Sequence, residues 1–203
     1  MPPPSRRAIS GRAQLKVLVS PLRQELLDLL VRTGPASAAD LGGLLRRPAD
    51  GLYYHLRALE RAGLVSKESG RAGAGRKEAL FRAVHREPAL RHDTSPGGNS
   101  PAVAAIVASM LRLGARDFRR ASALAGVRTE GPRRDLWALR VTGWLSPGQL
   151  ADVNARIHAL RDAVARPRSK ADLYGITILL TPLGHRARKK QSRPRATQRK
   201  NTR

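Results

Sequence analysis

The sequence contains no cysteine, few aromatic side chains and no long apolar run. Without cysteine there can be no disulfide, no thiolate metal site and no cysteine nucleophile. Aromatic residues make up 3% of the chain and apolar residues 41%, mostly Ala, Leu and Val, which favours helical packing over an aromatic-rich β-sandwich. No stretch reaches the length of a membrane span and no signal peptide is visible, so we expect a cytoplasmic protein with no membrane partner.

Acidic residues are scarce relative to basic ones. The 203 residues include 39 Lys or Arg and 15 Asp or Glu, a net charge of +24, which points to a polyanionic partner and to nucleic acid first. The charge is uneven, because residues 184–203 hold nine basic residues and no acid. We expect this segment to be a disordered basic tail, and the Pro-rich residues 1–12 to be a flexible basic arm.

One helix, residues 49–62, organises the rest of the sequence. Leu52, Leu56 and Leu59 are spaced four and three apart, which puts them on one buried side, and Gly63 stands where such a helix would end. The opposite side carries polar and aromatic residues: Tyr53, Tyr54, Arg57, Glu60 and Arg61. Such a face suits a DNA major groove, although a helix that only packs would show the same pattern.

The preceding segment predicts the partner of this helix. Residues 13–33 carry a Leu stripe, and Ser37 with Asp40 three residues later is a capping-box variant that opens a second short helix. Arg46 and Arg47 stand in the break before the central helix. Two short helices joined in this way predict a helix-turn-helix.

The segment after the central helix predicts a hairpin, residues 66–84. A strand begins at Leu64, a second strand covers Ala79 to Ala83, and Gly-rich residues lie between them. We expect three basic residues of this turn to contact phosphates: Arg71, Arg76 and Lys77. The turn matches a nucleotide-binding loop poorly, because no Ser or Thr follows Lys77 and no helix comes next.

These motifs together resemble a known family. The residues concerned are Pro21-Leu22-Arg23, Ala39-Asp40-Leu41, Tyr54-His55-Leu56-Arg57-Ala58-Leu59 and Ala62-Gly63-Leu64-Val65. On them, residues 13–85 resemble the winged helix-turn-helix domain of ArsR-type bacterial transcription regulators. The resemblance implies that helix 49–62 enters the major groove. The DNA-binding residues we expect in and before this helix are Arg46, Arg47, Asp50, Gly51, Tyr53, Tyr54 and Arg57.

Metal sensing and catalysis find little support in the sequence. The metal-sensing regulators of this kind use Cys pairs or clusters of His and acids on the dimer helix, whereas residues 101–125 contain no His and a single acid, Asp117. We expect no metal and no cofactor. Paired catalytic carboxylates and a nucleophile–base motif are also missing, so we do not expect an enzyme.

A further long helix is predicted at residues 101–125. Its apolar face must be buried, either against its own chain or, as in ArsR-like regulators, against a second copy. The residues expected at a dimer contact are Val103, Ile106, Val107, Met110 and Leu111. After it we expect a helix from Ser146-Pro147 and a strand at 174–182, while Trp137 and Trp144 could be core or line a small-molecule effector pocket.

The predicted fold is mainly α with a small β part. The expected organisation is a DNA-binding domain at 13–91, a linker at 92–100 and a dimerisation and C-terminal helix/strand module at 101–183. The predicted function is a dimeric, sequence-specific regulator that binds double-stranded DNA in the nucleoid. The alternative is a nucleoid-associated architectural protein that coats DNA largely without regard to sequence.

Overall fold

The computed structural model describes residues 8–69, 78–85, 89–165 and 172–184. It has an α+β winged-helix fold, as the sequence predicts. The helices are α1 (Arg12–Leu18), α2 (Pro21–Thr33), α3 (Ala38–Leu45), α4 (Asp50–Arg61), α5 (Ser100–Ser122) and α6 (Pro147–Ala165). The strands are β1 (Ala8–Ile9), β2 (Ala36–Ser37), β3 (Val65–Ser69), β4 (Ala79–Ala83) and β5 (Ala89–Leu90).

The chain divides into two units. The first unit comprises Met1–Trp137 and Pro167–Thr177, and the second comprises Ala138–Arg166 and Ile178–Arg203. Every buried apolar residue belongs to the first unit, within the part of the chain that the structure describes.

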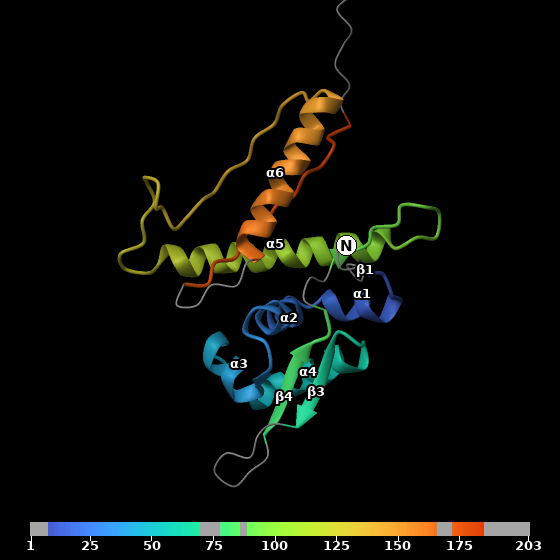
Figure 1. Cartoon of the computed structure of the whole chain (residues 1–203), viewed down its shortest axis with the longest axis vertical. Coiled ribbons are helices and arrows are strands. Elements are labelled where there is room, and N and C mark those ends of the chain that lie inside the picture. The colour runs from blue at the N-terminus through green and yellow to red at the C-terminus, as the bar shows by residue number, and fades with distance from the viewer. Residues whose placement is uncertain (1–7, 70–77, 86–88, 166–171, 185–203) are drawn as a thin grey trace, which may run out of the picture. The chain divides into compact units, whose positions relative to one another are not determined.

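The core of the first unit is built by α1 to α5 and a three-stranded sheet. The strand order is β2–β4–β3, and both pairs are antiparallel, with Lys67 opposite Phe81 in the hairpin. Phe81 is 2% exposed and lies among buried leucines of α2, α3 and α4. Figure 1 shows α5 lying across α1 and α2, on the opposite side of this unit from the β3–β4 hairpin.

Residues 8–12 do not form the expected flexible arm. Ala8 and Ile9 pair in parallel with Ala89 and Leu90, and the backbone N–H of Arg91 donates to the carbonyl of Ile9 at 3.0 Å. Ile9 is 2% exposed, so burial of its side chain anchors this strand. The rest of the predicted arm, residues 1–7, lies outside the described residues.

The strand expected at 174–182 is wrong. Residues 172–183 are irregular, and no ladder to another strand is formed there. Within the first unit, the Tyr174 hydroxyl instead donates to Asp135 at 2.8 Å, and a Cβ on Gly114 of α5 would lie 3.3 Å from Thr177 Oγ1. The β-branched residues that suggested a strand need a neighbouring strand to pair with. The alternation of Leu139 and Val141 gives no strand either.

Candidate nucleic-acid interface

The turn between α3 and α4 is fixed by tight backbone packing. A Cβ on Gly42 would lie 2.7 Å from the carbonyl oxygen of Arg47, so only glycine fits at this point of α3. Arg46 ends α3 with φ of +53°, and its N–H bonds back to the carbonyls of Gly42 and Gly43. This close approach lets α3 and the turn that follows it pack tightly together.

The start of α3 is held by the predicted capping box. Ser37 Oγ accepts from the backbone N–H of Asp40 at 3.1 Å, and Asp40 Oδ2 accepts from the Ser37 backbone N–H at 2.9 Å. The Ser37 backbone N–H and hydroxyl both donate to the Asp40 carboxylate, which stabilises its ionised form and lowers the pKa of Asp40. The cap thus sets where α3 begins and, through the turn, where α4 lies.

Helix α4 has one buried and one open side, as predicted. Leu52, Leu56 and Leu59 are at most 1% exposed and pack into the core. The solvent side carries Asp50, Gly51, Tyr54, Arg57 and Arg61. The spacing of these exposed positions follows one face of the helix, so they form a single surface that we call the α4 face.

Tyr53 is not on the α4 face. Its ring is half-buried and meets Phe81 of β4 edge to face, with ring centroids 6.3 Å apart. Tyr54, the next residue, is 64% exposed. Whether Tyr53 contacts DNA stays a prediction, but its packing ties α4 to the hairpin.

Sequence reasoning missed Arg23 as a site residue. The guanidinium carbon of this α2 residue lies 5.8 Å from the ring centroid of Tyr54, within the range of a cation–π interaction. Arg23 Nη1 also donates to the carbonyl of Val17 at 3.2 Å, which directs the side chain toward α4. The two residues are far apart in the sequence, so helical periodicity gives no signal of this contact.

His55 lies at the edge between the α4 face and the core. Its ring meets that of Tyr54 edge to face at 5.3 Å, and Nδ1 is buried with no hydrogen-bond partner among the described residues. Burial lowers the pKa of His55, and the positive charges of Arg23 and Arg47 lower it further. This geometry favours a packed histidine over a direct base contact.

The first residues of α2 also hold α5. Gln24 is buried, and its Nε2 donates to the carbonyls of Leu18 at 2.6 Å and Ile106 at 3.3 Å. Glu25 accepts two hydrogen bonds from the guanidinium of Arg116, at 2.5 and 3.1 Å. Arg23, Gln24 and Glu25 thus connect one turn of α2 to both α4 and α5.

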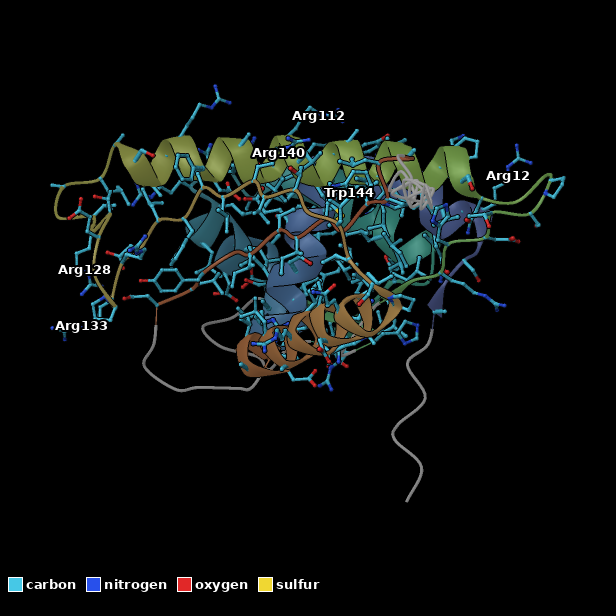
Figure 2. All side chains as sticks on the ribbon, turned by 90° about the horizontal axis from the view of Figure 1, so that it is seen from above. Arg12, Arg112, Arg128, Arg133, Arg140 and Trp144 are labelled. Atoms are coloured by element: carbon cyan, nitrogen blue, oxygen red, sulfur yellow. The ribbon has the colours of Figure 1, made fainter. Side chains whose placement is uncertain are left out.

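The predicted wing is partly described. The β3 and β4 strands pair as expected, and Arg82 forms an exposed ion pair with Glu68 across the hairpin at 2.8 Å. The three residues predicted to bind phosphate, Arg71, Arg76 and Lys77, lie outside the described residues. Lys67 is exposed on β3. Other arginines extend into solvent away from the helix-turn-helix, including Arg12 and Arg112 (Figure 2).

The expected dimer residues divide into two groups. Val103 and Ile106 are 8% and 1% exposed and belong to the core of their own chain. Their burial against α1 and α2 corrects the expectation that they supply a surface to a second copy. Val107 and Met110 are half-buried at the edge of that core, and Leu111 is 48% exposed.

The described residues contain no helix long and apolar enough to span a membrane. They also contain no group of three or more His, Cys, Asp or Glu side chains placed to hold a metal ion.

Comparison with known proteins identifies the same region. A family model described as a helix-turn-helix domain matches residues 18–68, from the end of α1 to β3. It represents a winged helix-turn-helix family related to the ArsR-type regulators. No curated protein matches the sequence. The match covers Arg23, the capping box, the α3–α4 turn and the whole α4 face, so the helix-turn-helix domain indicates a DNA-binding regulator.

Proposed function

We propose that this protein is a sequence-specific regulator of the ArsR-like type, which binds double-stranded DNA in the cytoplasm as a homodimer. The observation that supports this best is the α4 face. Tyr54 and Arg57 are exposed side by side on a helix whose opposite side is buried, and the helix-turn-helix holds that helix at the surface. Their side chains are long enough to reach base edges in a major groove.

The proposed binding mode has two parts. Arg57 and Tyr54 contact bases, with Asp50 and Gly51 close to the groove. Arg46, Arg47, Arg71, Arg76 and Lys77 contact phosphates, since basic side chains in turns commonly fix the register of a protein on the duplex. Two copies would place two α4 helices on successive half-sites.

The proposed dimer uses the outer edge of α5. Val107, Met110 and Leu111 are the expected residues there that are not fully buried in their own chain. We propose that the protein acts by binding and not by catalysis, because its sequence carries no nucleophile–base or paired-carboxylate motif. A small-molecule effector is a further proposal, and no residue is assigned to it.

The experiment is competition binding with two DNAs. Fragments bound by the protein are selected from genomic DNA, and a labelled selected fragment then competes with random duplex of equal length. We expect Arg57→Ala to lose about 1–3 kcal/mol on the selected site and much less on random DNA. Arg112→Ala on α5 removes the same charge away from the α4 face and serves as the matched control.

A second function is favoured by one observation, the net charge of +24. A nucleoid-associated protein that coats DNA would show a small ratio between specific and random affinity. If selection returns no shared site and Arg57→Ala weakens both DNAs equally, the architectural function replaces the sequence-specific one.

A further inference from the structure

Three buried polar side-chain atoms have no hydrogen-bond partner in the part of the chain that the structure describes, and two of them belong to neighbours of Tyr54. These two are Arg23 Nε and His55 Nδ1, and the third is Ser109 Oγ of α5. Folded proteins pair nearly all of their buried polar groups, because an unpaired one loses its hydration without compensation. Two such atoms beside one ring of the α4 face therefore point to a role other than stability.

The Tyr54 ring has a neighbour on two sides. The guanidinium carbon of Arg23 lies over the ring face, 5.8 Å from its centroid, and the His55 ring meets it edge to face at 5.3 Å. Tyr54 is nevertheless 64% exposed. An exposed side chain without neighbours exchanges among rotamers in picoseconds to nanoseconds. The two contacts restrict this ring to one orientation and leave it open to a ligand.

Arg23 is itself held in place from a second helix. It stands in the first turn of α2, and its Nη1 donates to the carbonyl of Val17, near the end of α1, at 3.2 Å. This bond fixes the guanidinium but leaves the Nε–H unpaired. An apolar side chain of similar length would avoid that unpaired group. Packing alone therefore does not explain an arginine here, whereas a planar cation over an aromatic ring does.

Building on the proposed function, in which Tyr54 contacts a base, we propose that Arg23 and His55 are positioning residues for DNA sequence recognition. They hold the Tyr54 ring in the one orientation in which its hydroxyl, a donor and an acceptor, meets a base edge in the major groove. A ring that is held before binding loses little rotamer freedom at the groove. It also cannot turn to accommodate a mismatched base, so the two neighbours add specificity without contacting DNA.

The burial of the two unpaired atoms distinguishes this role from a phosphate contact. A phosphate of the duplex cannot reach Arg23 Nε or His55 Nδ1 while both are covered by protein. Burial and the charges of Arg23 and Arg47 lower the pKa of His55, so its ring is uncharged at neutral pH and does not attract a phosphate by charge. A positioning residue changes base preference, whereas a phosphate contact changes the salt dependence of binding to every sequence.

The experiment measures the affinity of the full-length protein for the selected duplex and for each of its single-base variants, at several salt concentrations. We expect Tyr54→Ala to lose discrimination at one base position by about three- to tenfold, which corresponds to one neutral hydrogen bond. Arg23→Met and His55→Ala should lose discrimination at that same position and at no other. Arg112→Met removes the same charge as Arg23→Met from an exposed site on α5, and it should keep the parent's discrimination at every position.

A double-mutant cycle tests whether Arg23 acts through Tyr54. In the Tyr54→Ala background, Arg23→Met should change discrimination by less than about twofold, since the ring that it positions is gone. The slope of log affinity against log salt should be the same in Arg23→Met and in Arg112→Met. Without DNA, nuclear Overhauser effects should connect the Tyr54 ring protons of the parent to both Arg23 and His55. Thermal unfolding of each variant verifies that it folds.

Parent-like discrimination in Tyr54→Ala, Arg23→Met or His55→Ala overturns the inference, while Arg57→Ala still tests the proposed function. A shallower salt slope in Arg23→Met with equal weakening on every duplex would make Arg23 a phosphate contact. Equal weakening with a lower unfolding temperature would make it a structural residue alone, and either result also overturns the inference. A parent protein with no preferred site overturns the proposed function and the inference with it, and that result is known before any variant is compared.

Discussion

At the scale of single residues, the two neighbouring glycines of α3 have different roles. Gly42 faces the carbonyl of Arg47, whereas a Cβ on Gly43 would meet nothing within 4 Å. We expect Gly42→Ala to destabilise the domain by about 1–3 kcal/mol, as overpacking does, because backbone atoms would have to shift. Gly43→Ala is the matched control and should stabilise it by roughly 0.5–1 kcal/mol through helix propensity. Urea unfolding of both variants measures the difference, and equal effects would contradict it.

Ser109 is a second residue with a clear prediction. Ser109 lies on the packed side of α5, and its hydroxyl is fully buried and has no hydrogen-bond partner among the described residues. Ser109→Ala removes an unsatisfied polar group and improves helix propensity, so we expect the free energy of unfolding to rise by about 1 kcal/mol. A fall in stability would mean that the hydroxyl has a partner in solution. Thermal and urea unfolding provide the measurement.

Sequence patterns predicted the buried leucines of α4 correctly, because apolar residues at helical spacing mark the side of a helix that packs into a core. Leu52, Leu56 and Leu59 are buried where the spacing put them. The same patterns could not assign Val103 and Ile106, because an apolar stripe does not say whether its cover comes from the same chain or from another. They also missed Arg23 with Tyr54, since such a contact depends on how α2 crosses α4.

At the scale of elements, the cap of α3 links stability to pH. The hydrogen bonds from Ser37 lower the pKa of Asp40 in the folded state. The Asp40 carboxylate therefore stabilises the fold at pH values above its pKa in the unfolded chain, about 3.9, and this stabilisation is lost as the pH falls through its pKa in the folded state. We expect Asp40→Asn to lose about 0.5–1 kcal/mol at pH 7, toward the low end for caps because the carboxylate faces solvent. The difference from the parent should narrow below pH 3. A constant difference at both pH values would show that the carboxylate charge plays no part.

The ion pair between α2 and α5 supports another prediction at this scale. Arg116 and Glu25 side chains are 21% and 16% exposed, so the pair is partly withdrawn from water. Arg116→Met should cost about 1–3 kcal/mol, because the Glu25 carboxylate loses both hydrogen bonds while the apolar stem is kept. Arg119→Met, on the exposed part of the same helix, is the control. Similar losses in both variants would contradict a special role for the pair.

The strand predicted at 174–182 is absent, which shows that β-propensity alone does not make a strand. Ile176 and Ile178 gave a strong β signal, yet their backbone has no neighbour to pair with in the described structure. β-propensity measures how well a side chain fits a sheet that already exists. Helix α6, by contrast, was predicted correctly because its hydrogen bonds and its Ser146 cap are local.

At the scale of the whole molecule, charge sets the response to salt. Residues 184–203 carry nine basic residues and no acid, and residues 185–203 lie outside the described part of the chain. We expect their removal to weaken binding to selected and random DNA by a similar factor at low salt, since their charge displaces counterions without distinguishing bases. The gap between full-length and truncated protein should close as salt rises, which titrations at several salt concentrations would show. A larger loss on the selected site would instead place this segment in a groove beside it.

One short segment of α2, residues Arg23 to Glu25, contacts both α4 and α5. One turn of a helix spans about 5.4 Å. The contact with the Tyr54 ring and the two contacts with α5 therefore leave α2 within about that length. A ligand or partner that tilts α5 would move this turn of α2 and with it the Arg23 guanidinium over Tyr54. In the proposed dimer, a change at the α5 contact would therefore reach a side chain of the α4 face through α2.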